Sequence, residues 1–541
     1  MAVSYRSEPM VNREQTLWRL LRTGHVLDRP VLNEEQHHSS WMFGDPSDHL
    51  VVRAYIGDRV RIRFVHAAVK ETHVFHLHLY EWHALPGDPT SPRIDAISIS
   101  PQTGHTIEPV WGAGNRHQVA GDVIWHCHLY PHFHEGMWGI FRTFETRQDG
   151  EDGPDLDSAD CIYAGRRIGR YPDGTRISKL LPLPGNAPPE PTADRPGFPL
   201  YIPGRIRQKS PRPPWPDREF TEQECQDSNY RPPCEVVSLR GLDMPPDFDY
   251  RPFPTDLERL AFNELPVPGE MFSRNRIAKQ QQTWEPQKLA RNNSREVCHN
   301  LVVSQRRIDY NDHGWHDRHG HLYHLEADGD PAERSGPDEP LFFRAQHGQI
   351  VNMTLRNALP QTIEETEFDH AFPPCPALPW EGECAPHVHM VKFDPICADG
   401  ASVGWNYMSG ARIGRKRVYR WWADQEFGTI FFHDHLFANY RQKHGLFGAL
   451  IVEPAGSKFF HHLEPDQEIV SGLQALRSPT ASRPTAFVGS GSATTSSPRS
   501  AISRRPGSLR RSLSSTGGRY GPATISTSSP APTTCGSAVG G

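Results

Sequence analysis

A cysteine between two histidines is the feature of this sequence with the clearest chemistry. Cys127 stands between His126 and His128, and His132 and Met137 follow it. A thiolate, imidazoles and a weak thioether are the ligands of a blue-copper electron-transfer site. A structural zinc site is the alternative, but zinc prefers a closed tetrahedron and no second cysteine stands at ligand spacing. The two flanking histidines point away from the metal that the cysteine would bind, so they could hold a second metal centre.

Histidines separated by one residue recur in three further segments of the chain. In a β-strand, residues i and i+2 face the same side, so each pair projects two imidazoles in one direction. Together with the pair around the cysteine, four such pairs supply eight imidazoles, which indicates a cluster of metal ions. The pairs are His76 and His78, His126 and His128, His387 and His389, and His433 and His435.

With these motifs the chain resembles a multicopper oxidase, a member of a family of enzymes built from cupredoxin-fold domains. The resemblance covers residues 45–147 and 340–455. In that family a mononuclear type 1 (blue) copper accepts electrons from the substrate. A trinuclear cluster of one type 2 and two type 3 coppers, between two cupredoxin domains, reduces dioxygen to water. The resemblance therefore implies four copper ions.

The resemblance fills every expected ligand position. For the type 1 copper it implies His73, Cys127 and His132, with Met137 as the weak axial ligand, and for the type 2 copper His76 and His387. The implied type 3 ligands are His78, His126, His128, His389, His433 and His435. The catalytic electron route would be Cys127 with its covalent neighbours His126 and His128.

The order of the motifs departs from that of ordinary three-domain laccases, which carry the His-Cys-His motif last. Here it comes first, and this order resembles the large bacterial multicopper oxidases associated with manganese oxidation. The cluster could form within one chain, if the two β units pack face to face, or between chains.

Composition limits the classes of protein to consider. The chain has 541 residues, enough for several domains with cores of their own. Its 51 prolines and 44 glycines favour strands and loops over long helices. A net charge of −6 implies no nucleic-acid partner, and no apolar run is long enough for a membrane span. The expected partners are dioxygen and an electron donor, and an oligomer is compatible with the sequence.

The predicted fold class is all-β, with two cupredoxin-like Greek-key β-sandwich domains. Strand-like alternation of apolar and polar residues occurs in Val60–Val65 and in Gln349–Asn357. The predicted organisation is a cupredoxin-like domain with the blue site and half of the cluster (1–150), a long proline-rich irregular connection (151–295), a cupredoxin-like domain with the other half (296–465), and a disordered tail (466–541). A degenerate third domain is an alternative for the connection.

The end of the chain has an unusual composition. Residues 469–541 contain eight arginines but no aspartate, glutamate or lysine, and this composition cannot build a core. A basic tail could bind an acidic partner. The favoured interpretation is a GC-rich gene read in a shifted frame, in which case a natural C-terminal portion is missing.

The sequence allows more than one cellular location for the protein. The first 21 residues lack the apolar core of a signal peptide, so either the protein stays inside the cell or its natural start is absent. Relatives act mainly outside the cytoplasm. The nine cysteines form no small disulfide framework, although Cys375 with Cys384, or Cys225 with Cys234, could pair in an oxidising compartment.

Several residues near the motifs have two interpretations. Five histidines between residues 312 and 324 could hold an additional metal, but a polar loop is favoured: His313, His316, His319, His321 and His324. Histidines beside the motifs are expected to support the ligands or to lie on the surface: His83, His117, His134 and His444. Asp434 and Glu135 could relay protons or bind a cationic donor, or they could be solvated strand residues.

The predicted function is a four-copper oxidase, which takes single electrons from a phenolic, organic or metal-ion donor such as manganese(II) and reduces dioxygen to water. A copper nitrite reductase also consists of cupredoxin domains, but it needs one blue and one type 2 site, so eight cluster histidines would be superfluous. A non-catalytic copper-binding protein, or a truncated and inactive oxidase fragment, is the third possibility.

Overall fold

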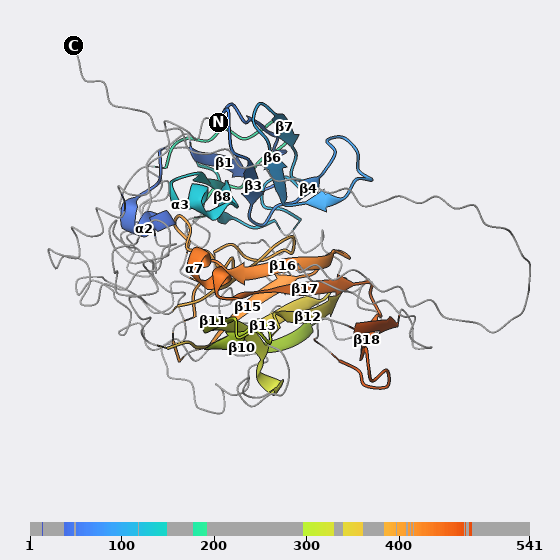
Figure 1. Cartoon of the computed structure of the whole chain (residues 1–541). Coiled ribbons are helices and arrows are strands. Elements are labelled where there is room, and N and C mark those ends of the chain that lie inside the picture. Colours follow the sequence, from blue (N-terminus) through green and yellow to red (C-terminus); the bar gives the residue numbers. More distant parts are fainter. Residues whose placement is uncertain are drawn as a thin grey trace, which may run out of the picture. The chain divides into compact units, whose positions relative to one another are not determined.

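The structure is a computed structural model, and its described residues fall into several stretches. These are residues 37–47, 50–116, 118–148, 177–191, 296–328, 339–360, 383–396, 398–406, 409–411, 413–414, 416–469 and 475–478, with Arg13, Phe198 and Ser471. The described part is mainly strand with short helices, so the all-β prediction is confirmed (Figure 1).

The first domain is built on a five-stranded sheet in the order β1-β9-β8-β3-β6, with β1 and β9 parallel. Two short pairs, β2 with β7 and β4 with β5, complete it. Strand β8 is buried at every residue because it lies between β9 and β3. The elements are α2 (Ser40–Phe43), β1 (Val51–Tyr55), β2 (Ile62–Val65), β3 (His73–Leu77), β4 (Trp82–His83), β5 (Arg93–Ile94), β6 (Ala96–Ile99), β7 (Gly104–Ile107), β8 (Gly121–Cys127), α3 (Tyr130–His134) and β9 (Trp138–Phe144).

The second domain has two four-stranded sheets, in the orders β11-β10-β13-β15 and β12-β17-β16-β14. Its elements are β10 (Glu296–Asp309), β11 (His316–Leu325), the 3₁₀ helix η5 (Glu326–Asp328), β12 (Leu341–Gln346), β13 (Ile350–Ala358), β14 (Pro386–Val388), β15 (Lys416–Trp422), β16 (Gly428–Asp434), α7 (Ala438–Lys443) and β17 (Phe447–Glu453). A separate pair consists of β18 (Lys458–His461) and β19 (Ala475–Ser478).

Aromatic side chains join the two sheets of the second domain. The ring of Phe432 on β16 lies 5.3 Å, between centroids, from both Phe343 on β12 and Tyr323 on β11. Trp421 on β15 lies 6.4 Å from the same ring. Because β11 and β15 belong to one sheet and β12 and β16 to the other, these contacts form the interior of a β-sandwich.

One prediction about local structure is wrong. The histidine-rich segment predicted as a polar loop is largely strand β11, which pairs antiparallel with β10 and buries His321 and His324. The apolar residues of this strand, Leu322, Tyr323 and Leu325, lie near its C-terminal end and are buried. Within the predicted disordered tail, the four residues of β19 pair with β18, and the chain beyond them lies outside the described residues.

Other predictions fall on residues outside the described part. They include His117, the cysteine pairings, the chain beyond Ser478 and most of the connection 151–295. Within that connection, residues 177–191 contain neither helix nor strand, in keeping with their prolines.

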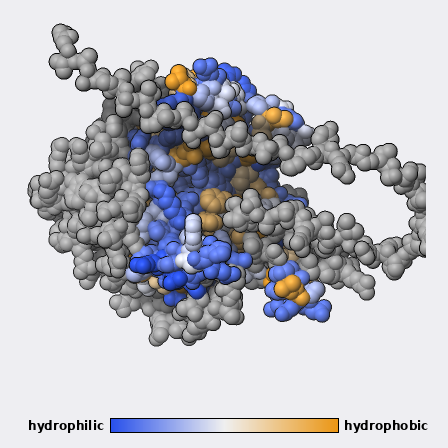
Figure 2. Space-filling view, in the orientation of Figure 1, coloured by the Kyte–Doolittle hydropathy of each residue, from blue (hydrophilic) through white to orange (hydrophobic). Residues whose placement is uncertain are grey.

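The described residues contain no helix that is long and apolar enough to cross a membrane. On the face in Figure 2 the described surface is mainly hydrophilic, with apolar residues in small patches.

Candidate copper centres

Three donor atoms from the first domain converge beside α3. Nδ1 of His73 lies 2.9 Å from Nδ1 of His132, and Sγ of Cys127 lies 3.8 Å and 3.5 Å from these two atoms. The backbone N–H of Cys127 donates to the carbonyl of Met137 at 3.0 Å, and Met137 donates to the carbonyl of His132 at 2.9 Å. The main chain of Met137 is therefore bonded to the main chains of two of the three residues that carry these ligand atoms. Two imidazoles and one thiolate in a triangle fit the ligand set of a blue copper ion.

A second group of imidazoles lies between the two domains, in three sets. Nε2 of His76 is 3.4 Å from Nε2 of His387. In a second set, Nε2 of His389 lies 3.4 Å from Nε2 of both His128 and His433. Imidazole nitrogens that share one metal ion at about 2.0–2.1 Å stand roughly 3–3.5 Å apart, so these spacings fit shared ions.

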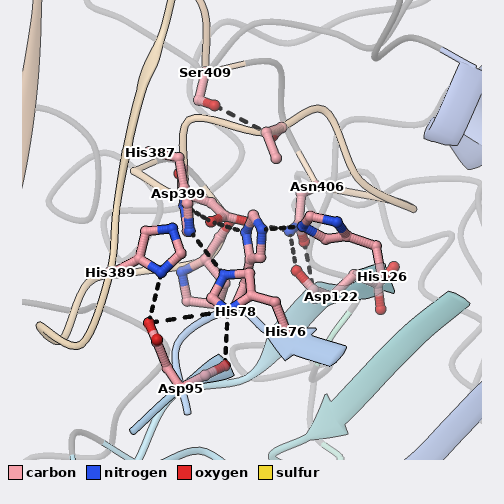
Figure 3. A network of polar contacts seen from close by, with 12 residues as sticks. His76, His78, Asp95, Asp122, His126, His387, His389, Asp399, Asn406 and Ser409 are labelled. Carbon is pink, nitrogen blue, oxygen red and sulfur yellow. Dashed lines mark hydrogen bonds and ion pairs between the residues drawn. The ribbon is translucent and has the colours of Figure 1, made fainter. Parts of the chain in front are cut away.

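The third set consists of His78, His126 and His435. Nε2 of His78 is 3.2 Å from Nε2 of His126. The ring of His435 lies 4.7 Å from that of His78 and 5.4 Å from that of His126, between centroids. All eight histidines of the four predicted pairs thus come together (Figure 3 shows several of them).

Strand register sets the position of several of these ligands. In the β3–β8 ladder, His76 stands opposite His126, and in the β14–β16 ladder, His387 stands opposite His433. Directly opposite side chains in an antiparallel pair are about 4.5–5.5 Å apart at Cβ. The second histidine of each pair lies one residue past the end of its strand.

Polar groups around the cluster fix which imidazole nitrogen faces inward. His76 donates from Nδ1 to the carbonyl of Asp95 at 2.7 Å, and Nδ1 of His389 lies 2.9 Å from the carboxylate of Asp95. Nδ1 of His78 and of His387 lie 2.9 Å and 3.0 Å from the buried carboxylate of Asp399. With Nδ1 occupied in this way, Nε2 is left to bind a metal ion.

Burial controls the protonation of the site. Loss of hydration, together with the neighbouring His389 and His435, lowers the pKa of the His128 imidazole to about 3. The pKa values of the other fully buried imidazoles are also well below the ordinary value for the same reason: His76, His78, His126, His387 and His433. Neutral imidazoles are the form that binds metals.

The pKa values of two further groups at the site also differ from their ordinary values. Burial raises the pKa of the Cys127 thiol, so metal binding there would release a proton. Although burial alone would raise the pKa of Asp95, the neighbouring His389 and His76 hold it below its ordinary value.

A cavity of about 200 Å³ reaches the cluster between α3 and α7. Its lining combines cluster ligands with residues of the two helices: His126, Cys127, His128, Tyr130, Phe133, His433, His435, Ala438, Asn439, Gln442 and Lys443. A small molecule could reach the ligands through it.

The two carboxylates considered as proton relays lie apart from the ligand atoms. Asp434 accepts from the backbone N–H groups of Ala385 and Phe437 and pairs with Arg441 at 3.0 Å, so it fixes the start of α7. Glu135 is exposed at the end of α3. Asp95 and Asp399, which do contact ligands, carry no local signal in the sequence because they lie outside the histidine motifs.

The other histidines near the motifs lie as follows. His83 contacts the carbonyl of Ser91 at 3.1 Å, and His134 is buried on α3. His444 pairs with Asp317 at 2.6 Å on β11. Within the described part of the chain, none of these residues, nor any of the five histidines of 312–324, belongs to a group of converging ligand atoms.

The fold and the donor set define a cupredoxin-type copper protein. Residues 26–147 and 385–457 match two family models, each described as multicopper oxidase. Both matched regions are thus similar to multicopper oxidases, which are copper-binding oxidoreductases, and the resemblance that the motifs predict is confirmed.

Two individual proteins are also similar to this chain. The probable nitrite reductase-hydroxylamine oxidoreductase fusion protein of Kuenenia stuttgartiensis is 30% identical over 96 residues, which make up 18% of this chain. The match spans 10% of that protein's own length. A crystal structure of a multicopper oxidase is matched with 13% identity over 74% of this chain and 78% of its own, with a TM-score of 0.17.

Proposed function

We propose that the protein is a four-copper oxidase that takes single electrons from a donor at a type 1 site and reduces dioxygen to water at a trinuclear site. The supporting observation is that one tripeptide, His126-Cys127-His128, supplies ligands to both groups of donor atoms. Bound copper would supply one-electron transfer and oxygen reduction.

The side chains take the roles that their grouping suggests. His73, Cys127 and His132 would hold the type 1 ion, with Met137 beside it. His76 and His387 would hold the type 2 ion. The two remaining sets would each hold a type 3 ion: His128, His389 and His433, and His78, His126 and His435.

Cys127 connects the sites by few bonds. Its peptide neighbours are both cluster ligands, and Nδ1 of His126 donates to the carbonyl of Cys127 at 3.0 Å, which adds a second, hydrogen-bonded connection. His126 and Cys127 are buried. The cavity between α3 and α7 would admit dioxygen to the cluster.

The donor would approach at His132, which is partly exposed. The carboxylate of Glu71, itself half exposed, lies 3.3 Å from Nε2 of His132. A carboxylate at this edge favours a cationic donor such as manganese(II) over a neutral phenol or another organic donor. Comparing the rates of manganese(II) and phenol oxidation by the copper-loaded protein would decide between these donors.

Copper nitrite reduction is a second candidate, because the name of the Kuenenia protein includes nitrite reductase. Eight converging imidazoles exceed what one type 2 copper needs, and this favours the oxidase. Nitrite-dependent turnover without oxygen uptake would reverse that preference, and copper binding with neither activity would favour a non-catalytic copper protein.

Replacing Cys127 with Ser tests the proposal. Loss of the thiolate should abolish the blue absorption and donor oxidation, while copper remains in the imidazole cluster. Cys298→Ser, at a cysteine of the second domain, is the matched control and should keep both. Donor oxidation that survives in Cys127→Ser would contradict the assigned electron route.

A further inference from the structure

A buried group of charges lies where the two domains meet. Nζ of Lys392, from the second domain, contacts the carboxylate of Glu81, from the first, at 2.8 Å. The same Nζ lies 3.2 Å from the carboxylate of Asp424. All three side chains are 0% exposed. A lysine removed from water in this way is stable only if its partners are well placed.

Glu81 receives donors from both domains. Besides Lys392, it accepts from Arg93 of its own domain at 2.8 Å and from Nε2 of Gln425 in the second domain at 2.7 Å. Arg116 of the first domain reaches Asp424 at 3.2 Å. These contacts cross between the domains in both directions, so the position of Lys392 depends on their docking.

Lys392 also holds a strained turn beside a cluster ligand. Met390 has a φ of 62°, a conformation that side-chain-bearing residues rarely adopt. Lys392 donates to the carbonyl of Met390 at 3.0 Å, and the N–H of Met390 donates to the carboxylate of Asp95 at 3.0 Å. The turn is therefore held from both sides, by one residue of each domain.

The residue before Met390 is His389, whose Nε2 contacts the imidazoles of both His128 and His433. The same Asp95 oxygen that accepts from Met390 lies 2.9 Å from Nδ1 of His389. Figure 3 shows the contact between Asp95 and His389. The carbonyl of Asp95 accepts from His76. The path from Glu81 through Lys392, Met390 and Asp95 thus ends on two cluster ligands.

We infer that Lys392 is a positioning residue for the cluster: held by Glu81 across the domain contact, it fixes the Met390 turn and thereby His389. The inference rests on the proposed function, because it concerns the same copper cluster. The simpler alternative is that Lys392 only balances the buried charge of Glu81 and Asp424.

Lys392→Met, with its copper retention measured against a graded chelator, tests the inference. We expect the cluster copper to leave at chelator concentrations roughly 10–100-fold lower than in the unchanged protein. The blue absorption should persist, because His73, Cys127 and His132 do not touch this network. Lys458→Met, which removes an exposed lysine paired with Glu468, is the control and should behave as the unchanged protein.

A double variant separates the two explanations. Glu81→Gln with Lys392→Met removes both charges of the pair. If Lys392 only balances charge, the double variant regains copper retention. If Lys392 holds the turn, the double variant stays as impaired as Lys392→Met, and Lys392→Arg, which keeps donors, retains more copper than either.

The outcomes are distinct. Unchanged cluster copper in Lys392→Met, or its restoration in the double variant, overturns the inference. If Lys392→Met fails to fold, Glu81→Gln takes its place: selective loss of cluster copper supports the inference and unchanged retention overturns it. Failure of the unchanged protein to bind copper or show blue absorption would instead refute the proposed function.

Discussion

At the scale of single residues, the proposed cluster would depend on carboxylates that lie behind its imidazoles. Asp399 illustrates this, because one of its oxygens lies 2.9 Å from Nδ1 of His78 and 3.0 Å from Nδ1 of His387. A carboxylate in this position fixes the tautomer and the ring orientation of both imidazoles and strengthens them as ligands. One side chain thereby prepares ligands from both domains.

Asp399→Asn should therefore weaken the cluster selectively. The amide keeps the size of the side chain but loses its charge and one acceptor, so copper affinity at the cluster should fall roughly 10–100-fold. Equilibrium dialysis against a copper buffer would measure the change. Asp394→Asn, whose carboxylate accepts from the backbone of Ile396, is the matched control. Equal copper occupancy in both variants would contradict this role.

At the scale of elements, strands β8 and β9 support the cysteine ligand through tight packing. Gly139 on β9 faces Trp125 on β8, and a Cβ at Gly139 would overlap the indole ring and lie 2.5 Å from the carbonyl of Leu50. Trp125 immediately precedes His126, so the absence of a side chain at Gly139 lets β8 keep its ligands in register.

Gly139→Ala should destabilise the first domain. Overpacking of this kind costs about 1–3 kcal/mol, and the displaced indole should also loosen copper at His126. Chemical denaturation of the metal-free protein would measure the stability, and a chelator titration the copper. Gly104→Ala on β7, whose new Cβ would meet nothing closer than 3.9 Å, should have little effect. A cost no greater than that of the control would argue against tight packing here.

The element scale also shows how far the sequence could predict the site. The i, i+2 spacing predicts that His387 and His389 share a direction, and both join the cluster. The spacing could not show that β14 pairs with β16, because strand pairing is set by the whole sheet. The prediction of a polar loop for residues 312–324 was wrong because the apolar Leu322, Tyr323 and Leu325, which are buried in β11, were given too little weight against the histidines.

At the scale of the whole molecule, the cluster is a product of tertiary structure. Asp399 lies 321 residues from His78, and Lys392 lies 311 residues from Glu81. No local pattern specifies such partners, so these ionic contacts could not be predicted from the sequence, whereas the histidine pairs could be recognised in it. Gathering eight imidazoles away from water should also make the stability of the metal-free protein depend on pH.

The metal-free protein should lose stability in acid. The folded pKa of His128 is about 3 and those of its buried neighbours are well below 6.5, the value expected in the unfolded chain. Below pH 6.5 the unfolded chain takes up protons that the folded chain does not. The free energy of unfolding should therefore fall with falling pH, by roughly 1.4 kcal/mol per pH unit for each imidazole that stays neutral.

Denaturant titrations of the metal-free protein at pH 7.5, 6.5 and 5.5 would measure this dependence. The buried imidazoles should change the stability little between pH 7.5 and 6.5. Below pH 6.5 the stability should drop steeply. His128→Gln removes one such imidazole, so its slope below pH 6.5 should be smaller by about one proton. Stability that is flat or rises between pH 6.5 and 5.5 would mean that the imidazoles accept protons in the folded state, and hence that the cluster opens to water when no metal is bound.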